Sequence, residues 1–176
     1  IIENLNIVPK AILFWRAILQ WLGGIGIIIM AITLMPIMNI GGMKLFTVTS
    51  HQAPEKILPQ SKAITLRLVI IYSSLTFVCA IFYKLFGMSL FDSITHSMTT
   101  IATGGFSNYN ESIGYFKSGA IEFTSMIFII LGSIPFIAYI KFLGGNKKIA
   151  FDDAQIKAFI KLIILSILIL YIYLVI

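Results

Sequence analysis

The sequence predicts an all-α membrane protein in which transmembrane helices flank a re-entrant pore helix and its filter loop. Of its 176 residues, 59% are hydrophobic and 11% are charged, whereas a soluble domain carries about 25% charged residues. Four apolar runs approach or exceed the roughly 20 residues that cross a bilayer. Between the second and third runs lies a shorter helical segment that ends in a glycine-centred turn.

The four apolar runs are the predicted transmembrane helices. They lie at about 11–38, 63–86, 120–143 and 154–176. Pro135 in the third run is expected to kink its helix, because proline lacks an amide donor. The chain starts without a methionine and stops inside an apolar run, so we expect a fragment of a longer protein.

The basic residues lie between the helices. The net charge of +6 is not gathered on one face with interleaved aromatic residues, which argues against nucleic acid as a partner. Two segments that are rich in lysine, 44–62 and 144–153 with its flanks, are placed in the cytoplasm by the positive-inside rule. Cys79 is the only cysteine, so the sequence offers no disulfide framework and no cysteine-built metal site.

Residues 90–101 are predicted to form a helix that enters the membrane without crossing it. Ser89 and Asp92 have the form of a capping box at its start, and apolar residues then recur at helical spacing. The segment rises about 18 Å, roughly two thirds of a hydrocarbon core of about 30 Å. Its other face is polar, with His96 and Thr100 among its members, so it should not face lipid.

The turn at 103–107 follows this half-helix and suggests an ion filter. Gly104 and Gly105 permit backbone angles that other residues avoid, and carbonyl oxygens could then replace the hydration shell of an ion. The C-terminal end of the half-helix adds a partial negative charge that favours a cation. No acidic side chain lies in the turn, so selectivity would come from backbone oxygens. The alternative is an ordinary tight turn in an interfacial loop.

Helix 11–38 carries polar residues and glycines that invite several interpretations. Arg16 and Gln20 are one helical turn apart near its outer end, where an arginine can reach the interface by snorkelling; a role in ion passage is the alternative. Gly23, Gly24 and Gly26 are predicted to permit close helix packing, with a hinge as the alternative.

Five motifs follow one another along nearly the whole chain. They are Trp15-Arg16-Ala17-Ile18-Leu19-Gln20-Trp21-Leu22-Gly23-Gly24-Ile25-Gly26, Gly41-Gly42-Met43, Phe91-Asp92-Ser93-Ile94-Thr95-His96, Ala102-Thr103-Gly104-Gly105-Phe106-Ser107 and Ser112-Ile113-Gly114-Tyr115-Phe116. In this order they resemble the Trk/Ktr/HKT potassium transporter superfamily, and most closely its bacterial TrkH-type subunit.

The resemblance implies four repeats around one pore, each made of a helix, a pore helix with its filter loop, and a second helix. The chain then divides into five parts: 1–43 is the end of repeat one with its closing helix, 44–62 is a cytoplasmic loop, 63–143 is the complete repeat two, 144–153 is a second cytoplasmic loop, and 154–176 is the truncated first helix of repeat three. Only the second of four filter strands would be present.

The resemblance also assigns the site residues. The implied filter strand is Ala102, Thr103, Gly104, Gly105 and Phe106, and the backbone carbonyls of Thr103, Gly104 and Gly105 would bind potassium. Gly105 matches the filter glycine of the family because an aromatic residue and a hydroxyl residue follow it, and Gly104 is the alternative register. Support for the pore helix is expected from Asp92, His96 and Thr100. For His96 we expect a hydrogen bond to a neighbouring repeat; pH sensing or the orientation of a carbonyl is the alternative.

The resemblance further implies a setting and partners. It predicts a multi-pass protein of the bacterial plasma (inner) membrane, a homodimer, and a cytosolic nucleotide-binding regulatory ring of the TrkA/KtrA type that contacts loops such as 41–62. Potassium is the expected substrate, with no catalytic residue, no enzymatic activity and no cofactor. The remaining repeats of the same protein would complete the pore.

Three rival functions are compatible with a chain this apolar. A secondary transporter of another solute would show a matching interrupted helix elsewhere, but only a single interrupted helix is predicted from the sequence. An intramembrane hydrolase would pair His96 with Ser97, but neighbours on a helix point about 100° apart. A non-conducting membrane remnant of a split gene is the third alternative.

Overall fold

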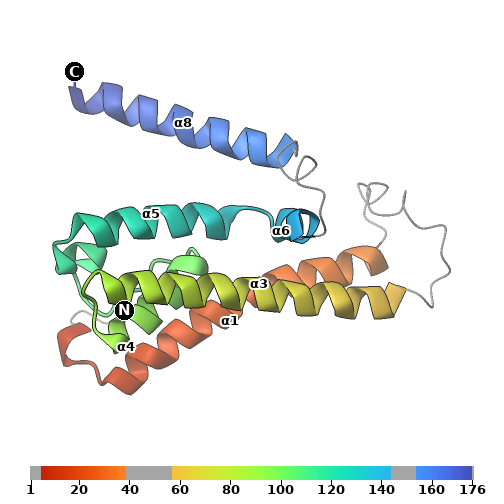
Figure 1. Ribbon diagram of the computed structural model, residues 1–176, viewed down its shortest axis with the longest axis horizontal. Coiled ribbons are helices and arrows are strands. Elements are labelled where there is room, and N and C mark those ends of the chain that lie inside the picture. Colours follow the sequence, from red (N-terminus) through yellow and green to blue (C-terminus); the bar gives the residue numbers. More distant parts are fainter. Residues whose placement is uncertain (1–4, 39–56, 144–153, 176) are drawn as a thin grey trace. The chain divides into compact units, whose positions relative to one another are not determined.

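The computed structural model describes residues 5–38, 57–143 and 154–175, and all the regular structure within them is helical (Figure 1). The predicted all-α class is therefore confirmed. The chain divides into two compact units, Ile1–Ser133 and Ile134–Ile176, which are described separately below. The predicted cytoplasmic loops, apart from 57–62, lie outside the described residues.

The first unit holds the candidate site. Its elements are η1 (Leu5–Ile7), α1 (Lys10–Met38), α3 (Ile57–Leu85), α4 (Leu90–Ile101), η3 (Ser112–Phe116) and α5 (Gly119–Ser133). Within α1 and α3, Lys10–Met30 and Ala63–Leu85 are long and apolar enough to cross a membrane. Helix α3 begins six residues earlier than residue 63, where we expected it. Pro59 does not prevent this, because an amide in the first helical turn has no partner inside the helix.

Helix α4 forms the centre of the first unit. Its bounds, Leu90 and Ile101, are those predicted, and it packs against α1, α3 and α5 (Figure 1). Its polar face is buried, as expected. The hydroxyls of Ser93, Thr95 and Ser97 donate to carbonyls of the preceding turn of the helix, at 2.8, 2.9 and 2.9 Å, so these buried polar groups are hydrogen-bonded.

The third predicted transmembrane helix is interrupted, so the prediction of a continuous helix over 120–143 is wrong. Helix α5 ends at Ser133, and α6 (Phe136–Leu143) begins after Pro135. Proline has no amide to donate and disfavours helical geometry in the residue before it, here Ile134. What we expected to be a kink is therefore a break.

The second unit contains α6 and α8 (Ala154–Val175). Helix α8 is 22 residues long and is apolar enough to cross a membrane. Among the described residues there are thus three candidate spans rather than the four predicted, while α5 is a shorter apolar helix.

Candidate selectivity filter

The start of α4 is capped by its predicted pair, but in a different way from a capping box. The Ser89 hydroxyl oxygen accepts from the Asp92 amide at 3.1 Å and donates to Asp92 Oδ2 at 2.6 Å. The carboxylate thus lies in the first turn of the helix, where the helix dipole stabilises negative charge. Its remaining capacity to accept hydrogen bonds is directed to the segment that follows the turn.

Asp92 ties this later segment to the start of α4. Asn108 Nδ2 donates to Asp92 Oδ1 at 2.8 Å, and the Tyr109 hydroxyl donates to Oδ2 at 3.1 Å. Asn108 Nδ2 also donates to Thr95 Oγ1 at 2.7 Å. Asp92 and Asn108 are only 6% and 7% exposed. Hydrogen bonds to an ionised acceptor are stronger than neutral ones, so the chain is fixed just beyond the turn.

His96 makes the second attachment. Its Nδ1 lies 2.9 Å from the Asp92 carbonyl oxygen, and its Nε2 lies 2.9 Å from Ser107 Oγ. A carbonyl can only accept, so Nδ1 carries the proton, and in the neutral ring the Ser107 hydroxyl donates to Nε2. Ser107 Oγ in turn accepts from the Tyr109 amide at 3.1 Å. Both ring nitrogens of His96 therefore have their partners within residues 92–107, whereas we expected a partner from a more distant part of the protein.

The end of α4 is fixed against both flanking helices. Thr100 Oγ1 and the Tyr83 hydroxyl of α3 lie 2.8 Å apart. On the other side, a Cβ atom at Gly132 of α5 would lie 2.7 Å from the carbonyl oxygen of Ile101, so only glycine permits this approach. The roles of Tyr83, Gly132 and Asn108 were not predicted from the sequence. The hydroxyl and amide groups in apolar surroundings were the available signal, but nothing local pointed to their partners.

The turn after α4 has an alternating backbone. Thr103 and Gly105 have positive φ angles of 52° and 77°, while Ala102 has φ −70° and Gly104 has no positive φ. Positive φ is a genuine outlier for a β-branched residue such as threonine, and strain of this kind concentrates at functional sites. A backbone of this kind directs successive amides to one side.

The first amides of the turn donate hydrogen bonds, whereas its carbonyls accept none from the described residues. The amides of Ala102, Thr103 and Gly104 donate to carbonyls in the last turns of α4 at 3.1, 3.0 and 3.1 Å. Within the described part of the chain, no hydrogen bond ends on a carbonyl oxygen of residues 102–106. Residues 103–106 are also exposed. The turn thus presents unpaired carbonyl oxygens at an accessible surface.

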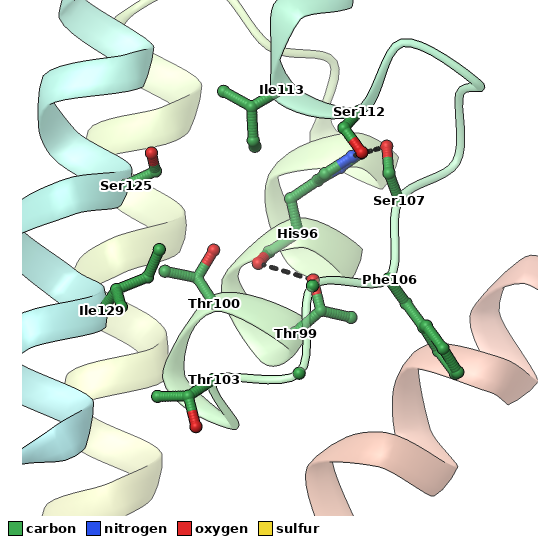
Figure 2. A pocket seen from close by; sticks show the side chains of 12 residues that line it. His96, Thr99, Thr100, Thr103, Phe106, Ser107, Ser112, Ile113, Ser125 and Ile129 are labelled. Atoms are coloured by element: carbon green, nitrogen blue, oxygen red, sulfur yellow. Dashed lines mark hydrogen bonds between the residues drawn. The ribbon is translucent and has the colours of Figure 1, made fainter. Parts of the chain in front are cut away.

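A cavity of about 250 Å³ adjoins the turn, between α4, α5 and η3 (Figure 2). The side chain of Phe106 points away from the other labelled residues, toward α1 (Figure 2). Most of the lining surface is apolar, although several residues with polar side chains border the cavity: His96, Thr99, Thr100, Thr103, Ser107, Ser112 and Ser125.

Three aromatic rings of the segment 109–116, which follows the turn, pack against one another. Tyr109 and Tyr115 stack with ring centroids 3.6 Å apart, and Phe116 stands edge-on to both at 5.5 and 5.4 Å. Burial, with a further contribution from the charge of Asp92, raises the pKa of Tyr109 to about 12. The phenol therefore remains a donor to Asp92 at neutral pH.

The site suits a weakly held cation better than a tightly chelated one. Its potential ligands are backbone carbonyls, and the described residues contain no group of three or more His, Cys, Asp or Glu side chains that could hold a metal ion. Rings of carbonyls replace the hydration shell of a permeating ion while still allowing it to leave. Among the residues predicted as supports, Asp92 and His96 attach the end of the turn, and Thr100 attaches its start.

Comparison with known proteins identifies the family. The TrkH family, described as cation transport proteins, matches residues 1–173. The Trk system potassium uptake protein TrkI of Halomonas elongata is 37% identical over 174 residues, which cover 98% of this chain and 35% of that protein. The Trk system potassium uptake protein TrkH of Escherichia coli K12 is 38% identical over 160 residues, which cover 89% of this chain and 33% of that protein.

A solved structure agrees with the sequence comparisons. The crystal structure of the potassium transporter TrkH from Vibrio parahaemolyticus superimposes with a TM-score of 0.76 at 39% identity, over 94% of this chain and 33% of that one. The chain spans about a third of the length of the relatives that it matches. The comparisons and the helical fold together show that this chain is a membrane protein of the TrkH family of cation transport proteins.

Proposed function

We propose that this chain is part of a potassium uptake protein in a bacterial plasma membrane, and that it supplies one of four strands of the selectivity filter. The observation that carries the proposal is the row of unpaired carbonyls at residues 102–106, of which 103–106 are exposed residues, directly after a 12-residue helix. The relatives are named as potassium uptake proteins, which supports potassium as the ion.

In this proposal, α4 is the pore helix. Its C-terminal end directs the negative end of the helix dipole toward the turn, which favours a cation there. A potassium ion would exchange its hydration shell for the carbonyl oxygens of Thr103, Gly104 and Gly105 and for those of three equivalent strands. The φ of 77° at Gly105 supports this glycine, rather than Gly104, as the filter glycine of the family.

The proposal extends to the organisation of the whole protein. Residues 1–43 would end repeat one, 63–143 would form repeat two, and 154–176 would open repeat three, with loops 44–62 and 144–153 in the cytoplasm. The other three strands would come from the remaining repeats. A homodimer and a TrkA/KtrA-type regulatory ring belong to the same proposal. The rival secondary transporter gains nothing from the break at Pro135, since that break lies in the same repeat as the filter turn.

The test replaces Gly105 in the full-length protein and measures potassium uptake and its selectivity over sodium in transport-deficient cells. Gly105→Ser should lower uptake or selectivity at least tenfold, because serine disfavours positive φ and would displace the carbonyls. Gly87→Ser is a matched control: Gly87 has a φ of 106° but follows the end of α3 at Leu85, outside the filter turn. Unchanged uptake and selectivity in Gly105→Ser, or equal losses in both variants, would refute the filter assignment.

A further inference from the structure

Three residues of α1 that are spaced four apart lie against alternate residues of the filter turn. A Cβ atom at Gly24 would lie 3.3 Å from Ala102 Cβ. A Cβ atom at Gly104 would overlap the side-chain amide of Gln20. The guanidinium carbon of Arg16 lies 4.8 Å from the centroid of the Phe106 ring. Helix α1 therefore follows the turn from its first residue to its last, in the antiparallel direction.

The spacing of these contacts fits the geometry of both segments. Four residues of an α-helix rise about 6 Å, and two residues of extended chain span at most about 7 Å. Residues 16, 20 and 24 of α1 can thus remain opposite residues 106, 104 and 102 along the whole turn. The remaining turn residues, Thr103 and Gly105, are those with positive φ.

Helix α1 is itself held by contacts with α3. Trp21 Nε1 donates to Thr76 Oγ1 of α3 at 3.0 Å, and the Tyr72 hydroxyl donates to the Trp21 carbonyl at 3.1 Å. A Cβ atom at Gly24 would also approach the Tyr72 hydroxyl oxygen to 2.8 Å. The contacts with the turn are therefore made from a helix whose position is fixed by α3.

Packing stability alone does not explain the polar residues at these positions. Arg16 Nη1 and Gln20 Oε1 are buried and have no hydrogen-bond partner among the described residues. A buried polar atom without a partner lowers stability, so apolar side chains at 16 and 20 would suit a purely structural face. The guanidinium can bind the face of Phe106 through a cation–π contact, and the Gln20 amide fills the space that glycine leaves open at 104.

We propose that Arg16 and Gln20 are positioning residues, which hold the filter strand at Phe106 and Gly104. Gly24 lacks a side chain and so allows Ala102, the first residue of the strand, to approach α1 closely. The inference rests on the proposed function, in which α1 closes repeat one and the turn belongs to repeat two. Helix α1 of one repeat then fixes the positions of residues 102, 104 and 106 in the filter strand of the next repeat. Asp92 and His96 hold the chain after this strand, and α1 holds the strand itself.

A cysteine pair tests the contact without relying on transport. The pair is Gln20→Cys and Gly104→Cys in the full-length protein with Cys79→Ala. A Cβ atom at Gly104 would lie 2.9 Å from Gln20 Cγ, one bond from Gln20 Cβ, so the two Cβ atoms would lie within about 4.5 Å, a distance that a disulfide can bridge. The control pair is Gln20→Cys and Gly105→Cys, because a Cβ atom at Gly105 would have no neighbour within 4 Å. Under mild oxidation in membranes, mass spectrometry of the linked peptides should show at least fivefold more cross-link for the 104 pair.

A double-mutant cycle tests the consequence for transport. We expect Gly104→Ala to lower potassium uptake about tenfold, and Gln20→Ala about threefold. In the Gln20→Ala background the added Cβ has room, so Gly104→Ala should then cost less than twofold, since contacting residues are not additive. Gly24→Ala should likewise impair uptake, whereas Gly23→Ala should not, because a Cβ atom at Gly23 would have no neighbour within 4 Å. Arg16→Lys should retain more selectivity than Arg16→Ala.

The outcomes separate this inference from the proposed function. A wild-type protein that takes up no potassium refutes the proposed function, and the cross-link then decides by itself whether α1 holds the turn. If the wild-type protein transports potassium, equal cross-linking of the two pairs overturns the inference. Uptake losses for Gln20→Ala and Gly104→Ala that simply multiply overturn it as well. Membrane abundance of each variant, measured in parallel, separates lost transport from lost protein.

Discussion

Removal of the Asp92 carboxylate should loosen the filter turn and destabilise the protein. The carboxylate accepts from Ser89 Oγ, Asn108 Nδ2 and the Tyr109 hydroxyl. In Asp92→Ala, one hydrogen of the buried Asn108 amide and the half-buried Tyr109 hydroxyl lose their acceptor, and a buried donor left unpaired costs about 1–3 kcal/mol. Together with the lost contact to the N-cap residue Ser89, the free energy of unfolding should fall by about 3–5 kcal/mol.

Asp92→Asn separates the charge from the shape. The amide keeps one acceptor oxygen for Asn108, and its NH₂ group can donate to the hydroxyl oxygens of Ser89 and Tyr109. The loss should therefore be smaller, about 1–2 kcal/mol, because hydrogen bonds to a charged group are replaced by neutral ones. Potassium uptake should fall in the same order, with Asp92→Ala below Asp92→Asn and both below wild type.

The assay is thermal unfolding of the detergent-purified protein, paired with uptake in cells. Glu111→Ala is the matched acidic control in the same segment, since Glu111 is exposed and its side chain makes no capping hydrogen bond. A surface substitution of this kind should change stability by no more than about 0.5 kcal/mol. If Asp92→Ala unfolds at the temperature of Glu111→Ala and transports equally well, the argument that Asp92 fixes the turn is refuted.

Three further predictions follow from other contacts. Because the folded-state pKa of Tyr109 is raised to about 12 above an unfolded value of about 10, its contribution to stability is complete below pH 10 and is lost as pH rises toward 12. Thermal stability should thus fall more steeply in this window for wild type than for Tyr109→Phe, and parallel curves would contradict the assignment. Tyr83→Phe removes the 2.8 Å bond to Thr100 and should lower unfolding free energy by about 1–2 kcal/mol, whereas Tyr115→Phe, as the control, should have little effect. The 176-residue chain alone should give no potassium-selective conductance in liposomes, because in the proposed function three of the four filter strands come from the remaining repeats; a selective current would show that it assembles its own pore.

Local signals in the sequence were enough to predict α4 and its turn. The capping pair at Ser89 and Asp92, the apolar spacing and the two glycines all act within a few residues of one another. The class of the fold followed from apolar length, which depends on composition alone. These features need no knowledge of distant contacts.

The differences from expectation arise where a local rule has two outcomes. A proline in a first helical turn is tolerated, so Pro59 did not mark the start of α3; a proline within a helix can kink or break it, and Pro135 breaks it. The partners of Asp92 and His96 could not be predicted, because Asn108 and Ser107 lie 16 and 11 residues away along the chain. Their approach depends on the path of the turn between them.

The strained turn is held by contacts at both of its ends. Positive φ at Thr103 costs about 1–3 kcal/mol, and the surrounding structure must compensate for it. At the start, the amides of Thr103 and Gly104 donate to α4; at the end, Ser107 and Asn108 bond to His96 and Asp92. The four partners all belong to α4: Thr100, Thr99, His96 and Asp92. Contacts with α4 therefore hold both ends of the turn, and the strand between these ends lies against Arg16 and Gln20 of α1.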